Sequence, residues 1–350
     1  MTGRTAVDDL VFKGRALIGE ELLVRDVALV VEGGIIRHIE EIPDQPSPWI
    51  CPALFNAHTH VGDSIAMDLP FEGNLEELVT PPDGLKHRIL AGTPDHELVS
   101  AMRATIAVME RGGIGGFADF REGGIQGVHL LHQAADGFSC RPLILGRDGG
   151  EFAGDGVGIS SARDVSLLEK VVSCSRESGK LVAFHAGEKD RFDIDAALSY
   201  EPDLIVHCTY ATRKQLKRCA DAGIQIAVCP RSNWMLGVIE NARRPPVREM
   251  LDLGCRISLG TDNCMVVQPD LWREMSFLST IYRLPARQIL QAAVEGSRLR
   301  NRTFFIEEGA PANFLVIDPG DSNLWLSHDP MQTLVSRAGI VNILTKVINS

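Results

Sequence analysis

The sequence predicts an α/β fold with a parallel-stranded (β/α)8 barrel at its centre. Short, continuously apolar runs recur along the middle of the 350-residue chain, and each is followed by a helical pattern. Runs of this kind are typical of parallel strands buried on both faces. Several of them end in histidine or aspartate, and the carboxyl ends of barrel strands are where active sites form.

The two ends of the chain differ from its middle. Short β-type runs fill the first 50 residues, at 10–12, 21–24, 27–31 and 35–39. Gly33-Gly34 between the last two runs indicates a hairpin, because glycine tolerates the positive φ angles of tight turns. A second β-rich stretch covers 304–318. Both ends therefore predict strands outside the barrel.

Strands and helices alternate through the middle of the chain. The run 50–57 predicts the first barrel strand, and a helix with Leu98, Met102, Ile106 and Met109 on one face should end at Gly112-Gly113. The later elements are expected at 114–120 (strand), 128–135 (helix), 142–145 (strand), 157–159 (strand), 165–177 (helix), 271–284 (helix) and 286–298 (helix), with further strands ending at His185, His207, Cys229 and Asp262. The strands complete the set of eight that a closed barrel needs.

The segment 61–94 interrupts this alternation. A long loop at the carboxyl end of a barrel strand is a candidate lid or substrate clamp. The residues in it that could reach a substrate are Glu72, Lys86, His87 and Arg88. A solvated surface excursion explains each of them equally well.

Composition narrows the class of protein. Apolar residues make up 45% of the chain and charged residues 23%, as in ordinary globular enzymes. No apolar stretch approaches the roughly 20 residues of a membrane helix, and the amino terminus lacks a secretory signal, so we expect a cytoplasmic protein without a membrane partner. The net charge of −11 argues against a nucleic-acid polymer as partner and favours a small molecule. The eight scattered cysteines indicate reduced thiols.

His58-Thr59-His60 is the most informative short motif. Residues two apart on a strand point the same way, so both imidazoles can reach one metal ion. Alone the motif is weak evidence. His185, His207 and Asp262 also sit at the ends of predicted strands, and barrel topology would bring all five side chains together.

Five segments carry a family resemblance: 56–60 (NAHTH), 185–188 (HAGE), 206–209 (VHCT), 229–233 (CPRSN) and 258–263 (SLGTDN). On these motifs the chain resembles the amidohydrolase superfamily, in the branch of cytosine deaminase, adenosine-type deaminases and triazine chlorohydrolases. The resemblance extends to about Ile317. It implies that both termini form one small β-sandwich domain, 1–50 with 304–350, beside a barrel domain, 51–303.

The resemblance also implies a metal site. One divalent ion would be held by His58, His60, His185 and Asp262; zinc is favoured, and iron, manganese or cobalt also suit this donor set. Such an ion lowers the pKa of bound water to about 7 and supplies hydroxide. A site with two metals usually has a lysine at the fourth strand, and 156–160 contains none.

Three catalytic roles follow from the same resemblance. Glu188 would protonate the substrate ring as a general acid. Asp262 would accept a proton from the attacking water. His207 would either bind the metal or orient that water, and the second role is preferred.

Substrate contacts are less constrained. Arg121 and Arg147 follow predicted strands and could bind an anionic group, or could pair with the adjacent Glu122 and Asp148. By resemblance Ser232 and Asn233 lie near the pocket. Trp234 could stack on a planar ring or belong to the core.

The hypothesis that these residues favour is a mononuclear metal-dependent aminohydrolase. It would release ammonia from an amino-substituted purine, pyrimidine, pterin or triazine-like ring. One alternative is a hydrolase of the chlorohydrolase or amidohydrolase type, acting on another carbon–nitrogen or a carbon–halide bond. Another is a non-catalytic metal-binding scaffold. A homo-oligomer is possible by analogy with relatives.

Overall fold

The computed structural model describes residues 10–45, 47–70, 77–78, 84–163 and 167–349, and its strands form two sheets. The larger sheet has nine strands, in the order β12 (Arg256–Leu259), β11 (Gln225–Val228), β10 (Leu204–His207), β9 (Leu181–Ala186), β8 (Gly156–Ile159), β7 (Arg141–Gly146), β6 (Ile114–Arg121), β5 (Leu54–His60) and β13 (Asp262–Asn263). All neighbouring pairs in it are parallel. These strands form the core of an α/β fold, as predicted.

The nine-stranded sheet curls round on itself. Its first and last strands, β12 and β13, are separated along the chain only by Gly260 and Thr261. At this corner the Thr261 amide donates a hydrogen bond to the His58 carbonyl of β5. Gly260 is required by close packing, because a Cβ there would lie 2.7 Å from the His58 Cβ. The arrangement is that of a TIM-barrel-like fold.

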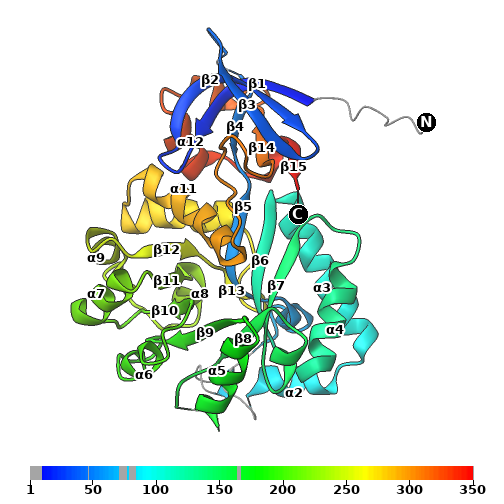
Figure 1. Ribbon diagram of the computed structural model, residues 1–350, viewed down its shortest axis with the longest axis vertical. Helices are drawn as coiled ribbons and strands as arrows, with labels where there is room; N and C mark the ends of the chain where they lie inside the picture. The colour runs from blue at the N-terminus through cyan, green and yellow to red at the C-terminus, as the bar shows by residue number, and fades with distance from the viewer. Residues whose placement is uncertain (1–9, 46, 71–76, 79–83, 164–166, 350) are drawn as a thin grey trace.

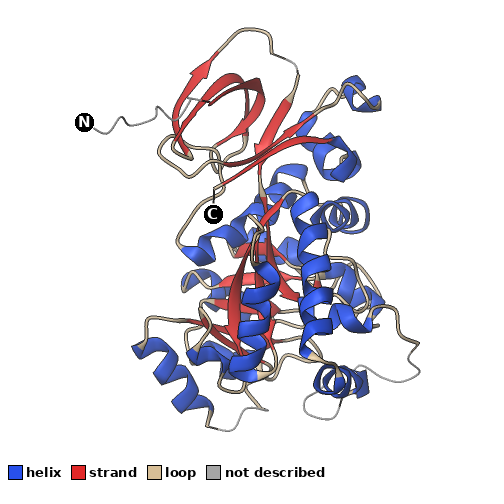
Figure 2. Cartoon of the chain, turned by 90° about the vertical axis from the view of Figure 1, so that its right-hand side faces the viewer, coloured by secondary structure: helices blue, strands red, loops and turns tan. Residues whose placement is uncertain are grey.

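Helices surround the curled sheet (Figure 2). The longer ones are α3 (Asp95–Arg111), α4 (Gly124–Ala135), α5 (Leu168–Glu177), α7 (Arg213–Asp221) and α11 (Ala286–Glu295). The shorter ones are α2 (Leu85–Gly92), α6 (Ile194–Leu198), α8 (Pro230–Met235), α9 (Val247–Asp252), α10 (Leu271–Phe277) and α12 (Pro330–Arg337). Short 3₁₀- or π-type elements are η1 (Val61–Ala66), η2 (Gly150–Phe152), η3 (Leu278–Tyr282), η4 (Gly296–Arg300), η5 (Asn323–Leu326) and η6 (Ile340–Asn342).

Most helix predictions hold, with shifted ends. Helix α3 buries Met102, Ile106 and Met109 and ends before Gly112, as its apolar spacing predicted. Helix α4 begins at Gly124, four residues before the predicted start, because the apolar periodicity appears only in its second turn. The predicted helix 271–284 ends two residues early, at Tyr282, and its last five residues, Leu278–Tyr282, have π-type hydrogen bonds.

The second sheet combines strands from both ends of the described chain. Its order is β15 (Ile343–Ile348), β14 (Asn313–Ile317), β4 (Trp49–Pro52), β1 (Leu10–Ile18), β2 (Leu23–Glu32) and β3 (Ile35–Glu41). Gly33 and Gly34, at φ 58° and 79°, form the predicted hairpin between β2 and β3. Figure 1 shows this sheet at one end of the molecule, away from α2 and α5.

The run 50–57 is divided between the two sheets. Strand β4 pairs with β1 and β14, whereas β5 begins two residues later and pairs with β6 and β13. Ala53 lies between them and donates its amide to the Asn313 carbonyl. Among the described residues, no helix has the length and apolar character needed to cross a membrane.

Candidate metal centre

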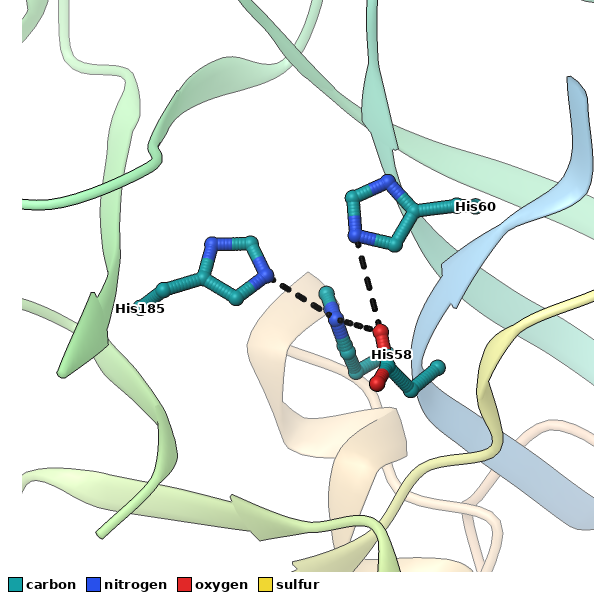
Figure 3. A group of neighbouring side chains, drawn as sticks. His58, His60 and His185 are labelled. Atoms are coloured by element: carbon teal, nitrogen blue, oxygen red, sulfur yellow. Dashed lines mark hydrogen bonds and ion pairs between the residues drawn. The ribbon is translucent and has the colours of Figure 1, made fainter. Parts of the chain in front are cut away.

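Three histidine rings and one carboxylate converge at the carboxyl end of the curled sheet (Figure 3). Strand β5 places His58 and His60 on one face, β9 supplies His185, and β13 supplies Asp262. His58 Nε2 lies 3.1 Å from His185 Nε2 and 3.1 Å from Asp262 Oδ1. His60 Nε2 lies 3.6 Å from the same oxygen. All four side chains are buried.

These spacings fit a bound divalent ion. Ligand atoms about 2.1 Å from a tetrahedral zinc lie roughly 3.4 Å from one another. Burial lowers the pKa of His58 to about 4 and that of His60 to about 3, and it lowers the pKa of His185 well below the usual range. The rings are therefore neutral at pH 7. Neutral imidazoles facing one another at hydrogen-bond distance are the donor set that a cation needs.

Asp262 completes this donor set as a carboxylate. Burial alone would raise its pKa, but the hydrogen bond from His58 and the nearby histidines hold it well below the usual range. Ser232 donates to the other oxygen, Oδ2, at 2.8 Å. Asn56 fixes the position of Thr261, the residue before Asp262. Its side-chain amide donates to the Thr261 hydroxyl and accepts from the Thr261 backbone N–H.

Glu188 and His207 form a second group with Asp262. The potential ligand atoms of these three residues also lie within 4.8 Å of one another, and Glu188 Oε1 is 3.8 Å from His207 Nε2. Burial raises the pKa of Glu188, although its side chain keeps 21% of its surface exposed. Glu188 is therefore an acid whose protonated form is favoured by burial and whose exposed part can contact a bound substrate.

The backbone is strained at two of these positions. His207 has φ 79° and Asp262 has φ 60°, in the left-handed region that non-glycine residues rarely occupy. Each such residue costs about 1–3 kcal/mol and persists only where its surroundings enforce it. The strain turns both side chains toward the same point beyond the strand ends.

A second layer of buried charges orients His60. Glu122 Oε1 accepts from His60 Nδ1 at 3.0 Å, and Lys86 Nζ lies 2.8 Å from the same oxygen. Lys86 also pairs with Asp63 at 2.9 Å. Sequence reasoning gave Glu122 no role at the metal and did not identify Asp63. The sequence offered one signal for each: Glu122 comes directly after β6, and Asp63 comes three residues after His60.

Arg121 and Arg147 both pair with Glu122. Arg121 is buried, 3.0 Å from Glu122 Oε2 and 3.5 Å from Asp119. Arg147 is 3.3 Å from Glu122 Oε1, and its Nη2 is 3.2 Å from His185 Nδ1. Ligation through His185 Nε2 requires the proton on Nδ1, where the Ile159 carbonyl accepts it at 3.3 Å. Of the two alternatives for these arginines, the structure shows salt bridges, but Arg147 pairs with Glu122 and not with Asp148.

Asn233 and Trp234 contact residues outside the cluster. Asn233 donates to the Thr209 hydroxyl at 3.0 Å in the core. Trp234 meets Phe277 edge-on, with ring centroids 6.1 Å apart. Among the residues of the 61–94 segment, Lys86 reaches the site, Arg88 is exposed, and Glu72 lies outside the described residues.

A cavity of about 360 Å³ opens onto the cluster; we call it the site cavity. Its described lining includes His60, His185, Glu188, His207 and Asp262, together with Lys86, Arg147, Ser160, Ser161, Arg163, Lys189 and Asp190. A larger cavity of about 850 Å³ shares only Arg147 and Ser160 with it. None of the four candidate ligands lines that larger cavity, so the chemistry belongs to the smaller one. His87 lines the larger cavity.

Two family models match the chain. The amidohydrolase family matches residues 49–152, and adenosine deaminase matches residues 152–302. A protein of Methanothermobacter thermautotrophicus named "Putative aminohydrolase" is 33% identical over 97% of each chain. A 5-methylthioadenosine/S-adenosylhomocysteine deaminase of Halobacterium salinarum is 24% identical over 91% of this chain and 84% of its own.

Solved structures show the same fold. An adenosine deaminase from Xanthomonas campestris with bound zinc superposes with a TM-score of 0.77 at 17% identity, covering 97% of this chain and 91% of that one. Atrazine chlorohydrolase from Arthrobacter aurescens in complex with zinc gives 0.75 at 17%, covering 95% and 94%. From the family models, the near-full-length relative and the converging ligands together, the chain belongs to the amidohydrolase superfamily, as a hydrolase acting on carbon–nitrogen bonds other than peptide bonds.

Proposed function

We propose that the protein is a mononuclear metal-dependent aminohydrolase that converts an amino-substituted nitrogen heterocycle and water into the oxo-substituted ring and ammonia. The observation that supports it most is the placement of Glu188, a partly exposed acid with a raised pKa, in the lining of the site cavity with its carboxylate within 4.8 Å of Asp262. We propose a purine-type ring first, because several relatives are named as deaminases of adenine nucleosides.

We further propose that the resident metal is zinc, held by His58, His60, His185 and Asp262. The solved adenosine deaminase and chlorohydrolase relatives contain it, and three neutral imidazoles with one carboxylate suit it. When bound there, such an ion polarises water so that it attacks at neutral pH.

The protein groups then divide the proton transfers between them. Glu188, whose pKa is raised by burial, gives a proton to the ring nitrogen next to the amino-bearing carbon, which makes that carbon more electrophilic. His207 hydrogen-bonds the attacking water. Asp262 takes one proton from the attacking water and passes it to the departing amino group. Glu188, which has given up its proton, takes the remaining hydroxyl proton, so that ammonia leaves, the ring carbonyl forms and the acid is regenerated.

The chain division that we propose has a composite β-domain, 1–50 with 304–350, and a barrel domain, 51–303. A separate hydrophobic cluster supports it. Residues of the six-stranded sheet and of the segment before β14 pack together in a cluster apart from the main core: Ala16, Val27, Leu29, Val31, Ile36, Ile50, Ile306, Ala312, Phe314 and Val316.

The test is ammonia release from adenine nucleosides, aminopyrimidines, pterins and aminotriazines, with a chlorotriazine assayed for chloride. Metal content is measured on the same preparation. We expect release from at least one purine-type ring, about one metal per chain, and loss of turnover in Glu188→Gln with its metal retained. Substantial ammonia release by Glu188→Gln would overturn the role of that residue, and chloride release without ammonia would establish the halide-releasing alternative.

A further inference from the structure

Another cavity lies beside the site cavity on the catalytic face of the barrel. It has a volume of about 570 Å³ and is formed by the loops at 189–192, 210–213 and 243–249. These loops lead into α6, α7 and α9, which Figure 1 shows on one flank of the barrel. Lys189 and Asp190 line both cavities, so a ligand in one can extend into the other.

The walls of this cavity, which we call the basic groove, are strongly cationic. Its basic side chains are Lys189, Arg191, Arg213, Arg243 and Arg244, and its acidic ones are Asp190 and Glu249. Both acids are already paired: Asp190 with Arg163 at 2.9 Å, and Glu249 with Arg213 at 3.1 Å. A positive groove is unexpected in a chain with a net charge of −11.

Three arginines of the basic groove remain for a ligand. Within the described part of the chain, no carboxylate lies at salt-bridge distance from Arg191, Arg243 or Arg244. Arg244 is held in place, because it donates to the Thr209 carbonyl at 3.2 Å and lies over the Tyr210 ring at 5.1 Å. The amino end of α7, capped at Thr212, adds its partial positive charge.

We propose that the basic groove binds an anionic group, phosphate or carboxylate, that the substrate carries away from its reacting ring. This rests on the proposed aminohydrolase function. With the amino-bearing ring at Glu188 and His207, the rest of the substrate passes Lys189 and places its anion among Arg191, Arg243 and Arg244. Guanidinium groups bind such oxyanions through paired hydrogen bonds, and a cleft of one charge sign concentrates ligands of the other.

The experiment compares matched substrates that differ in the anion. Adenosine 5′-monophosphate is paired with adenosine, and S-adenosylhomocysteine with methylthioadenosine. We expect the member that carries a phosphate or a carboxylate to have the higher kcat/KM in one of the pairs, and that pair identifies which of the two groups the basic groove binds. In the double variant Arg191→Gln/Arg243→Gln this preference should fall about tenfold, mainly through KM, because each partly exposed charged contact contributes a few-fold.

A matched control removes an arginine elsewhere. Arg37→Gln alters an exposed residue of β3, paired with Glu32 in the terminal sheet, and should leave the preference as in the wild type. Raising the salt concentration should reduce the preference in the wild type and much less in the double variant, since the attraction is electrostatic.

Calorimetric binding of inosine monophosphate and inosine to the metal-loaded protein separates the two hypotheses. Tighter binding of the phosphate that depends on Arg191 and Arg243, without ammonia release from any ring, would keep the anion site and refute the aminohydrolase function. Ammonia release with no preference for either anion, and equal binding of the two products, would overturn the basic groove and leave the function in place.

Discussion

Glu122 accepts a hydrogen bond from His60 Nδ1 at 3.0 Å, and this contact decides which ring nitrogen faces the other ligands. A neutral imidazole has one proton, so placing it on Nδ1 leaves the Nε2 lone pair directed at the site. Burial alone would raise the pKa of Glu122, but Lys86 and His60 hold it well below the usual range. The ring is thus oriented for ligation by a permanently ionised partner.

Replacing Glu122 by Gln should weaken metal binding. The amide keeps the shape but removes the charge that favours the Nδ1–H form of His60, and such outer contacts are typically worth about 10- to 100-fold in metal affinity. Competition with a chromogenic chelator measures the effect. Glu97→Gln, an exposed residue of α3, is the control. Equal affinities in the two variants would show that Glu122 does not tune the site.

Lys86→Met should destabilise the fold, because Asp63 and Glu122 would lose the cation between them. We expect the free energy of unfolding in urea to fall by about 3–5 kcal/mol, as when one partner of a buried ion pair is removed. Burial raises the pKa of Asp63 to about 7, even beside Lys86. Adding Asp63→Asn should therefore recover part of the loss. A double variant less stable than Lys86→Met would contradict this account.

Glu274 should make stability depend on pH. This side chain is fully buried against Arg231 at 2.9 Å, and burial raises its pKa to about 7 from an ordinary 4.5. An acid whose pKa is higher in the folded state than in the unfolded state stabilises the fold below its unfolded-state pKa. That contribution is lost as the pH rises through its folded-state pKa. Between pH 4.5 and 7 the wild type should lose about 3 kcal/mol relative to Glu274→Gln. Urea unfolding at pH 5 and 7.5 measures it; Glu240→Gln, an exposed control, should follow the wild type.

Metal removal should lower stability through the four candidate ligands. With free zinc at 100 times its dissociation constant, binding adds about 2.7 kcal/mol to the free energy of unfolding. We expect chelation to lower the melting temperature of the wild type and of His129→Asn, an exposed histidine of α4, but to leave His185→Asn unchanged. A wild type that melts at the same temperature with and without zinc would count against the site.

The convergence of the ligands was predictable because it depends on backbone periodicity. His58 and His60 lie two apart on β5. His185 is the last residue but one of β9, and Asp262 follows β12 after two residues, and the apolar runs of both strands are legible in the sequence. Parallel strand ends share one edge of a sheet, so topology alone brings these residues together. The coarse fold was predictable for the same reason.

The charges around the ligands were not predictable, because their positions depend on loop and side-chain geometry. Lys86 comes from α2, 26 residues beyond His60, and nothing in the local sequence shows that it turns inward to Glu122. Arg121 and Arg147 reach the same carboxylate from different strands. Which partner a long side chain selects is decided by distances in the folded state.

The junction between β4 and β5 links the two sheets in a way that affects the metal. Only Ala53 separates the last residue of β4, in the terminal sheet, from the strand that ends in His58 and His60. Loosening of the six-stranded sheet would therefore displace β5 and with it two of the candidate ligands. Cutting or truncating either terminus should therefore first cause loss of metal, although His58 and His60 lie at the opposite end of β5. On this view the six-stranded sheet holds the ligand-bearing strand in position.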